Sequence, residues 1–311
     1  MSNYLEDMFI DDVKGCLMGG CSGESDDGPE LLDTIVGRSV TELTCDSEIV
    51  GVYAFYKCKT LTTAYFPKAT SIGEYAFEYC ENLTTVNFPK AIEVSKYAFG
   101  YSKNLTTVNF PEVIDIGNHA FYGCEDLSTA VFPSATSIGD SAFELCKNLT
   151  TADFPKATKV YDSSFRNCIS LTTVNFPKAI EISRYAFYNC KTLTTACFPE
   201  VTDVGYYAFD GCLSLTIVDF PKATHIEDNV FNGNTELKML ILRNTSGVCT
   251  LDMRIYNSAI ESGTGYIYVP SALIDSYKTA TNWSSHAAQF RALEDYTVDG
   301  TVTGAIDETK I

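Results

Sequence analysis

Three residue types recur at one spacing along most of this chain of 311 residues. Phenylalanine returns every 22 residues, at Phe55, Phe77, Phe99, Phe121, Phe143, Phe165, Phe187, Phe209 and Phe231. The prolines Pro67, Pro89, Pro111, Pro133, Pro155, Pro177, Pro199 and Pro221 keep the same spacing, as do the leucines Leu61, Leu83, Leu105, Leu127, Leu149, Leu171, Leu193, Leu215 and Leu237. A fixed period in this range indicates a solenoid, in which each repeat buries its apolar face against its neighbours. We therefore expect one long coiled domain rather than several globular ones.

The repeat at residues 83–104 indicates how one coil is built. Its first part has the L-x-x-V-x-F spacing of a leucine-rich repeat strand, and alternation along a strand places Val86 and Phe88 inward. Pro89 is expected to end the strand, because proline cannot donate to a continuing ladder. Ile92 is expected to begin the return path and to point back inside.

These patterns predict an α/β solenoid. It is expected to be a leucine-rich repeat, right-handed superhelix with a parallel β-sheet on one face and short helical or 3-10 turns on the other, capped at both ends. Residues 1–38 are predicted to form an acidic N-terminal helix and linker, and residues 39–243 the array of 22-residue repeats. Residues 244–295 are predicted to be a C-terminal cap in which Trp283 closes the core, and residues 296–311 a hairpin or tail.

Most of the twelve cysteines share one phase of the repeat. They are Cys58, Cys80, Cys124, Cys146, Cys168, Cys190 and Cys212, and Ser102 and Asn234 take their place in two other repeats. A phase that accepts Cys, Ser or Asn is expected to be small, half-polar and buried. Side chains in such a ladder run parallel, which is the wrong orientation for a disulfide torsion, so we expect reduced thiols. Cys197 is expected to face solvent instead.

The net charge of −18 argues against a nucleic-acid partner, because this acidity repels phosphate backbones. The sequence has no apolar run long enough to span a bilayer, and no signal peptide is visible at its start. It carries no known catalytic motif, and His119, His225 and His286 lack metal-binding spacing. We therefore expect a protein that is not an enzyme and that needs no metal or cofactor.

Two variable columns interrupt the otherwise constant repeats. The first lies on the outward side of the strand, beside a nearly constant threonine column: Tyr65, Asn87, Asn109, Val131, Asp153, Asn175, Cys197 and Asp219. The second precedes the Ala-Phe pair: Tyr75, Tyr97, His119, Ser141, Ser163, Tyr185, Tyr207 and Asn229. Further tyrosines follow the second column at Tyr56, Tyr79, Tyr101, Tyr122 and Tyr188.

Exposed tyrosine clusters are typical of recognition surfaces, because each ring buries much area at a low entropy cost. The alternative is that these positions are simply unconstrained. The candidate ligand-binding residues are the first column without Cys197, together with Tyr75, Tyr97, His119, Tyr185 and Tyr207.

The repeat FPKATSIGEYAFEYCENLTTVNFPKA resembles the BspA-type leucine-rich repeat family in its Ile-Gly and Ala-Phe pairs, its Cys phase and its L-x-x-V-x-F-P strand. The resemblance covers roughly residues 40–243. The segment YIYVPSALIDSYKTATNWSSHAAQF is similar to the terminal module of such proteins from gut bacteria and their prophages. The resemblance implies a non-enzymatic protein, often displayed on a microbial surface, that binds host proteins or other cells. This chain departs from secreted members because no signal peptide or wall anchor is visible, so a virion or another export route also stays open.

Three functions are compatible with these features. The first is a binding or adhesion module that recognises a protein or a surface glycan. The second is a structural spacer or a tail or baseplate component of a phage-like particle, and the third is an intracellular scaffold. The variable columns favour the first, because a spacer is expected to have a uniform exposed face. Self-association through the N-terminal helix is a further expectation.

Overall fold

The computed structural model describes residues 41–307 and residue 309, and the expected N-terminal helix within residues 1–38 lies outside this range. The chain divides after Pro155 into two compact units. In each unit the strands are parallel and stack at the repeat spacing, so both units are parallel β-solenoids, as the sequence predicts. We call them the first unit, up to Pro155, and the second unit, from Lys156 onward.

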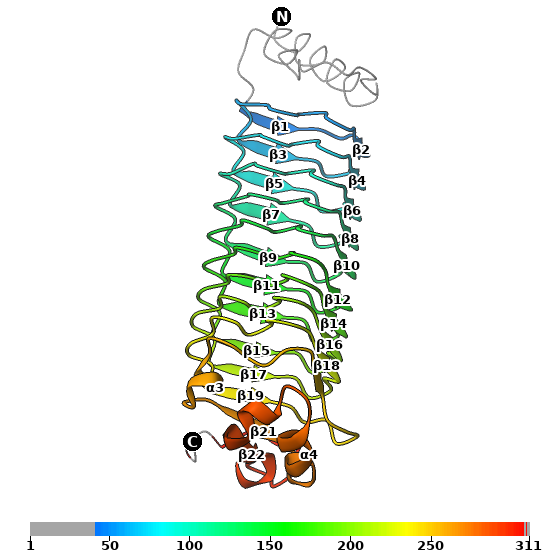
Figure 1. Cartoon of the computed structure of the whole chain (residues 1–311). Helices are drawn as coiled ribbons and strands as arrows, with labels where there is room; N and C mark the ends of the chain where they lie inside the picture. The colour runs from blue at the N-terminus through cyan, green and yellow to red at the C-terminus, as the bar shows by residue number, and fades with distance from the viewer. Residues whose placement is uncertain (1–40, 308, 310–311) are drawn as a thin grey trace, which may run out of the picture. The chain divides into compact units, whose positions relative to one another are not determined.

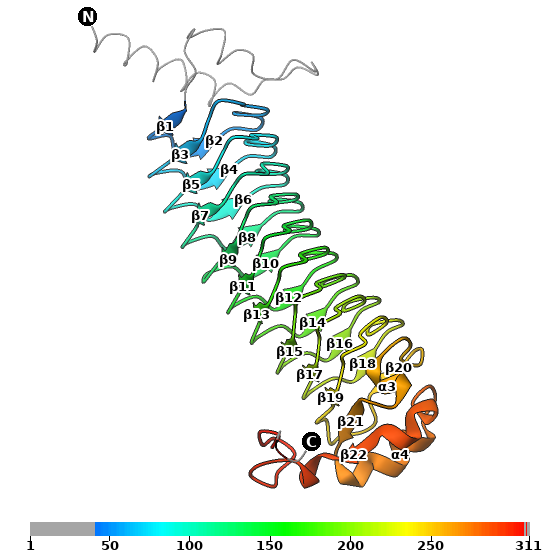
Figure 2. The ribbon, with the colours of Figure 1, turned by 90° about the vertical axis from the view of Figure 1, so that its left-hand side faces the viewer.

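The first unit contains two rows of short strands. The three-residue strands are β1 (Glu42–Thr44), β3 (Thr63–Tyr65), β5 (Thr85–Asn87), β7 (Thr107–Asn109), β9 (Thr129–Val131) and β11 (Thr151–Asp153). The two-residue strands are β2 (Ile49–Val50), β4 (Ser71–Ile72), β6 (Glu93–Val94), β8 (Asp115–Ile116) and β10 (Ser137–Ile138). The strands β1, β3, β5 and β7 form one parallel sheet and β2, β4, β6, β8 and β10 another, while β9 pairs in parallel with β11. The register is that of equivalent residues in successive repeats, as in Thr85 with Thr107. Figure 1 shows both rows stacked along the coil, and Figure 2 shows them from the side.

The second unit also contains two rows of short strands, and it ends in short helices. Its strands are β12 (Lys159–Val160), β13 (Thr173–Asn175), β14 (Glu181–Ile182), β15 (Thr195–Cys197), β16 (Asp203–Val204), β17 (Ile217–Asp219), β18 (His225–Ile226), β19 (Met239–Ile241), β20 (Thr250–Leu251), β21 (Tyr266–Val269) and β22 (Phe290–Ala292). Its helices are α3 (Ala259–Ser262), η1 (Ser271–Leu273), α4 (Ile274–Thr279), η2 (Ser284–Gln289) and η3 (Leu293–Asp295). One sheet runs from β15 through β17, β19 and β21 to β22, and another from β12 through β14, β16 and β18 to β20.

Two phenylalanine ladders fill the core of the coil. In the first unit Phe66 stacks on Phe88 and Phe55 stacks on Phe77, each pair with ring centroids 4.9 Å apart. The two ladders meet edge to face, with 6.1 Å between the centroids of Phe66 and Phe77. All four rings are at most 2% exposed. Close packing of this kind gives every repeat the same register, because a shifted ring would leave a void between two neighbours.

The expected inward position of Ile92 is wrong. Val86, Phe88 and Val94 are fully buried, as the alternation predicts, but Ile92 is 48% exposed. The N–H of Ala91 donates to the carbonyl of Phe88, so a turn follows Phe88 and shifts the phase of the residues after it. Ala91 takes the buried position that alternation had assigned to Ile92.

In every repeat, turns follow the two-residue strand, and these turns stack into one wall of the coil, which we call the turn wall. They take the place of the expected helical turns. The N–H groups of Tyr75, Phe77 and Tyr79 donate to carbonyls of the next repeat, and those of Ala76 and Glu78 close turns within their own repeat. Tyr75 and Tyr79 both have a φ of 59°. Within the described repeats this wall contains no helix, because alternate N–H groups are used between coils rather than along the chain.

The cysteine phase is buried except at Cys58, which is partly exposed, and none of the cysteines in the described range is bridged. The thiol of Cys80 donates to the carbonyl of Phe55 at 3.0 Å, and that of Cys124 to Phe99 at 3.1 Å. The hydroxyl of Ser102 donates to Phe77 in the same way at 2.7 Å. The phase therefore selects a small side chain that can donate to a buried carbonyl, which explains the exchange between Cys and Ser.

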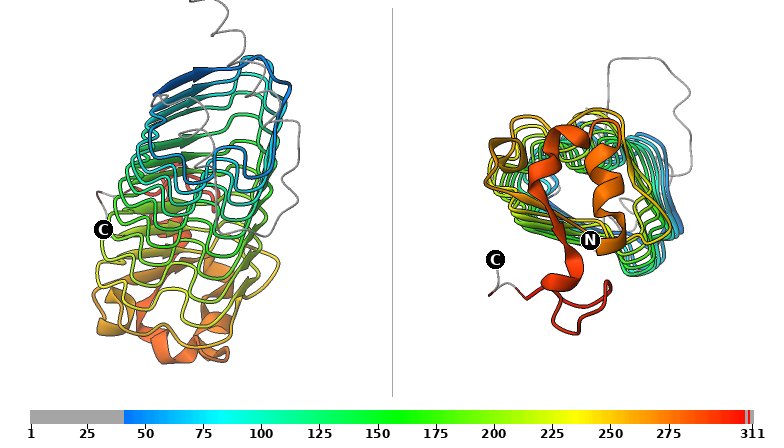
Figure 3. Two further views of the ribbon diagram at one scale, coloured as in Figure 1. Left: turned by 90° about the horizontal axis from the view of Figure 1, so that it is seen from above. Right: turned by 60° about the horizontal axis from the view of Figure 1, so that its bottom comes forward.

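The segment after β20 packs against the last coil of the second unit. Trp283 is fully buried, and its indole N–H donates to the carbonyl of Cys249 at 2.7 Å. The hydroxyl of Tyr277 accepts from the N–H of Cys249 at 2.9 Å, while its ring meets that of Trp283 edge to face. Figure 3 shows α4 across this end of the coil. After η3, Thr297 and Ile306 form an antiparallel bridge.

Candidate binding surfaces

The first variable column lies where the sequence places it, on the outward side of the three-residue strands. Tyr65 is 36% exposed and Val131 is 49% exposed. The amide of Asn109 donates to the side-chain oxygen of Asn87 at 2.8 Å, so these two candidates are joined in a ladder. Asp153, Asn175 and Asp219 occupy the same side of β11, β13 and β17.

Asp219 is engaged inside the protein. Its carboxylate accepts from Nε of Arg243 at 3.1 Å and from Nη2 at 2.9 Å. Nη1 of Arg243 donates to the carbonyls of Val302 at 3.0 Å and Gly304 at 2.6 Å. Arg243 thus joins the outward side of the three-residue strands, which we call the strand face, to the C-terminal segment that contains Val302 and Gly304.

The same segment covers the outward side of the last strands. Met239, Ile241, Tyr268 and Leu293 form a buried cluster there, and Ile306 packs against it. Burial raises the pKa of Tyr268 to about 12, with a further contribution from Tyr296. The outward face is therefore closed at the C-terminal end of the second unit.

The second column forms a stacked aromatic ladder in the first unit. Ring centroids are 4.8 Å apart between Tyr53 and Tyr75, 5.4 Å between Tyr75 and Tyr97, and 4.4 Å between Tyr97 and His119. Tyr53 extends the column by one repeat that the sequence interpretation left out. Stacking also changes the expected exposure, because Tyr75 and Tyr97 are half-buried rather than fully exposed.

The residues of the second column lie on the turn wall, and their backbones adopt the left-handed conformation. Values of φ are 52° at Tyr97, 58° at His119 and 54° at Ser141. Such a conformation is costly for residues with a Cβ atom, and it persists only where the surroundings enforce it. Here the hydrogen bonds between coils enforce it, so the positions are constrained in backbone and variable in side chain.

A second aromatic row runs beside the first. Tyr79 stacks on Tyr101 with centroids 4.7 Å apart, Tyr56 meets Tyr79 edge to face, and Tyr122 meets Tyr101 edge to face at 5.1 Å. Burial and the nearby Glu144 raise the pKa of Tyr122 to about 12. We call the two rows together, Tyr53, Tyr56, Tyr75, Tyr79, Tyr97, Tyr101, His119 and Tyr122, the tyrosine surface.

One carboxylate is buried within the tyrosine surface. Glu78 is 7% exposed, and burial raises its pKa to about 7 although the charge of Lys57 lowers it. The ammonium of Lys57 lies 4.8 Å from the centroid of the Tyr56 ring. The negative charge of Glu78 in turn raises the pKa values of Tyr79 and Tyr97, after burial, which is the larger cause.

The second unit has a shorter version of the same rows. Tyr185 stacks on Tyr207 with centroids 5.4 Å apart, and Tyr206 meets Tyr207 edge to face at 4.0 Å. The guanidinium of Arg166 lies 5.8 Å from the Tyr185 ring and 5.5 Å from the Tyr188 ring. Arg166 occupies the repeat position that Glu78 has in the first unit, four repeats of 22 residues earlier.

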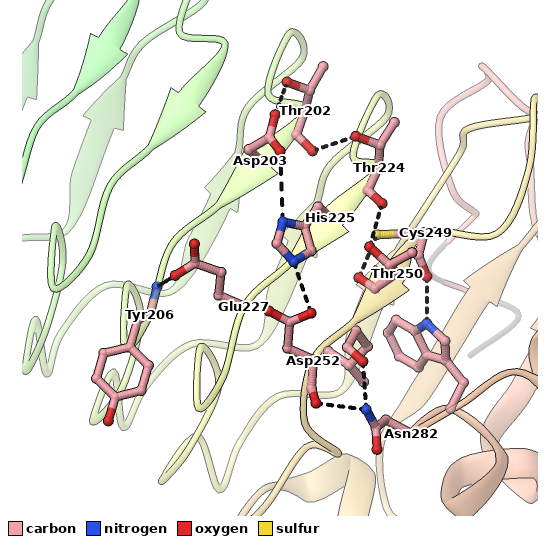
Figure 4. A network of polar contacts seen from close by, with 12 residues as sticks. Thr202, Asp203, Tyr206, Thr224, His225, Glu227, Cys249, Thr250, Asp252 and Asn282 are labelled. Carbon is pink, nitrogen blue, oxygen red and sulfur yellow. Dashed lines mark hydrogen bonds and ion pairs between the residues drawn. The ribbon is translucent and has the colours of Figure 1, made fainter.

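A ladder of polar side chains runs along the two-residue strands of the second unit, as Figure 4 shows. The hydroxyls of Thr202, Thr224 and Thr250 each donate to a carbonyl of the preceding coil. His225 lies between two carboxylates, with Nε2 3.0 Å from Asp252 and Nδ1 3.9 Å from Asp203. These groups are partly exposed, and ion pairs of this kind contribute little to stability.

The two candidate columns do not form one site. Tyr65 precedes Phe66 on one wall and Tyr75 precedes Phe77 on the other, and the two phenylalanines meet in the core between them. The columns therefore lie on different walls of the coil.

The sequence interpretation missed Glu78, Arg166 and the pairing of Asp219 with Arg243. For Glu78 a signal was available, since the position after Ala-Phe varies between acidic, basic and aromatic residues.

In the described part of the chain, no helix is both long and apolar enough to cross a membrane. The same residues contain no group of three or more His, Cys, Asp or Glu side chains arranged to hold a metal ion.

Comparisons with known proteins concern both units. The model of the BspA type leucine rich repeat region, in six copies, matches residues 48–172 and 158–262. A leucine-rich repeat protein from Bacteroides ovatus is 21% identical, with a TM-score of 0.52, over 78% of this chain and 69% of that chain. One from T. pallidum is 24% identical, with a TM-score of 0.47, over 57% and 79% of the two chains. A leucine rich cell surface protein from Faecalibacterium prausnitzii is 21% identical, with a TM-score of 0.38, over 75% and 74%. No curated protein matches the sequence.

Proposed function

This chain belongs to the BspA-type leucine-rich repeat family, and from that membership we propose that it is a binding or adhesion module for a protein or a surface glycan. Proteins with this fold are typically interaction modules without catalytic activity, so the proposed role is recognition without turnover. A rigid solenoid suits this role, because its binding face is formed before the partner arrives and little ordering entropy is lost.

The tyrosine surface is the observation that supports this proposal most strongly. In the first unit four rings stack without interruption from Tyr53 to His119, and a second row runs beside them. Half-buried rings of this kind keep their edges and hydroxyls at the surface while packing fixes their orientation. Such aromatic residues usually provide most of the energy of an interface. We therefore place the main contact with the partner on the turn wall.

The strand face is the second candidate surface, and several of its residues have internal partners. Asp219 pairs with Arg243, and Asn87 is bonded to Asn109. Tyr65 and Val131 remain exposed on this face. The strand face therefore offers mostly polar side chains, several of them already bonded within the protein, rather than a stacked aromatic row.

The test starts with a search for the partner, by capture from extracellular protein and on a glycan array. Two variants of the full chain are then compared with the wild type. The first changes the turn wall: Tyr75→Ser, Tyr97→Ser, Tyr185→Ser and Tyr207→Ser. The second changes the strand face: Tyr65→Thr, Asn87→Thr, Asn109→Thr and Asp153→Thr. Serine is a suitable replacement on the turn wall, because Ser141 and Ser163 already adopt the required φ of 54° and 55°.

We expect the first variant to lose most of its affinity and the second to keep most of it. Circular dichroism and thermal melts show whether each variant is folded. If both folded variants bind as well as the wild type, neither wall is the site. The chain would then be better described as a spacer or a particle component.

A further inference from the structure

Glu78 is a carboxylate buried between two rows of aromatic rings. It belongs to the turn that carries Tyr75 and Tyr79, one from each row of the tyrosine surface. Gly100 takes the same position in the next repeat. A Cβ atom on Gly100 would lie 2.9 Å from the Tyr97 ring and 3.4 Å from Cγ of Glu78. Gly100 therefore lets the Tyr97 ring close in beside the side chain of Glu78.

We propose that Glu78 and the tyrosines around it form a subsite for a cationic side chain, a guanidinium or an ammonium group, of a protein partner. The proposal rests on the proposed function, in which the tyrosine surface meets the partner, and it adds the chemical class that this surface recognises. The carboxylate supplies the charge, and the tyrosine hydroxyls at the exposed edges of the stacked rings supply oxygens that accept hydrogen bonds from the cation.

The charges around Glu78 support a cationic ligand. Lys57 is the cation that acts on Glu78, and its effect does not offset burial, because the pKa of Glu78 still rises to about 7. Glu74 adds negative charge beside Tyr53, whereas Lys96 lies 5.8 Å from the centroid of the Tyr97 ring. A buried carboxylate gains most from a counter-charge that arrives with a binding partner, because the low local dielectric strengthens their attraction.

The second unit provides an internal example of the same recognition. At the repeat position of Glu78 it has Arg166, whose guanidinium lies between 5 and 6 Å from the Tyr185 and Tyr188 rings. The turn wall can therefore hold a guanidinium against two tyrosines. In the first unit this position carries the opposite charge, which makes the aromatic rows a receptor for a cation rather than its source.

Binding of a cation should be coupled to the loss of a proton from Glu78. The bound cation favours the ionised carboxylate, so part of the affinity depends on ionisation. We expect affinity to rise as the pH is raised through about 7, where Glu78 titrates in the unbound protein. The charged or titratable groups near this site are Lys57, Glu74, Lys96, the surrounding tyrosines and His119, which stacks on Tyr97 and whose pKa burial lowers.

The experiment uses the full chain with isotope-labelled tyrosine and follows the ring signals by NMR. The probes are N-acetyl-arginine amide, N-acetyl-lysine amide and, as a neutral analogue of the first, N-acetyl-citrulline amide. We expect the two cationic probes to shift signals of the tyrosine surface and citrulline to bind roughly tenfold more weakly. Glu78→Gln should weaken both cationic probes by a similar factor and remove the dependence on pH.

Glu144→Gln is the matched control. Glu144 has the same repeat position and the same 7% exposure, but Ser141 and Leu145 replace the tyrosines of its own turn. This variant should bind the probes as the wild type does. Equal binding of citrulline and arginine, or unchanged binding by Glu78→Gln, would overturn the subsite. If the Tyr→Ser variant loses the captured partner while Glu78→Gln binds it fully, the proposed function stands and the cation subsite is wrong.

Discussion

Arg243 and Asp219 form an ion pair with 2.9 Å between Nη2 and Oδ2, and both side chains are largely buried, at 8% and 19% exposure. The same guanidinium donates to two carbonyls of the C-terminal segment. One residue from just after the last regular strand therefore fixes a segment about sixty positions later. It also removes Asp219 from the residues that a partner can reach.

Replacing Arg243 with Ala should cost roughly 3 kcal/mol of unfolding free energy, because it leaves the Asp219 carboxylate buried without its counter-charge. A urea melt followed by circular dichroism measures this loss. Arg184→Ala is the control: its pair with Asp162 is more exposed, at 66% and 31%, and we expect it to contribute less than about 1 kcal/mol. Equal effects of the two substitutions would show that the Arg243 pair has no structural role.

The sequence was sufficient for features that depend on the period, and insufficient where the backbone departs from simple alternation. Val86 and Phe88 point inward because side chains alternate between the two faces of a strand, and the apolar residues in the sequence indicate this alternation. Ile92 points outward because a turn at Ala91 shifts the phase of the residues after it. An isoleucine at this position gives no indication of that turn. The contact of Arg243 with Gly304 lies outside the period, so the repeats give no information about it.

The candidate sites show the same division. The variable columns could be found by comparing repeats, because variation against a constant background is visible in one sequence. The left-handed backbone of Tyr97 could not, since tyrosine rarely adopts it and the cause is a hydrogen bond to the next coil. Half-burial of the rings also escapes the sequence, because it depends on how closely the rings stack.

Cys197 should be the first thiol in the repeats to react with iodoacetamide. It is exposed on β15, although partial burial and the neighbouring Asp219 raise its pKa, so its rate should still increase above pH 9. Cys124, Cys146 and Cys190 are fully buried, and burial raises their pKa values further. Mass spectrometry after timed alkylation measures the order. Faster labelling of the buried set would mean that the faces of the repeat are misassigned.

Phe143→Ala should lower the unfolding free energy by about 3–5 kcal/mol, because it opens a cavity between neighbouring coils. Phe143 is fully buried and stacks on Phe121 with centroids 5.2 Å apart. Ile92→Ala removes an exposed apolar side chain and should change stability by no more than about 0.5 kcal/mol. The two variants are compared in the same urea melt. A loss below about 1 kcal/mol for Phe143→Ala would place its ring outside the core.

Asn234→Ser should stabilise the protein by roughly 1 kcal/mol, because it removes a buried amide that lacks hydrogen bonds. Asn234 is fully buried in the cysteine phase, and its side-chain nitrogen and oxygen have no partner among the described residues. Serine at this phase can donate to a carbonyl of the preceding coil, as Ser102 does at 2.7 Å. Ser102→Ala, which loses that bond, should be destabilising. A lower melting temperature for Asn234→Ser would contradict this account of the phase.

Glu78 should make the protein less stable as the pH rises from about 5 to 8. Burial raises its folded pKa from 4.5 to about 7, so the folded state holds a proton that the unfolded state has released in this window. The stabilisation that this extra proton gives is complete below pH 4.5, the pKa of Glu78 in the unfolded state. It is lost as the pH rises through about 7, the pKa of Glu78 in the folded state. Glu78→Gln stays neutral, so it should flatten this part of the stability profile and be more stable than the wild type at pH 8. Urea melts at several pH values measure the profile, and Glu144→Gln should retain the slope. A slope that survives in Glu78→Gln would show that another group causes it.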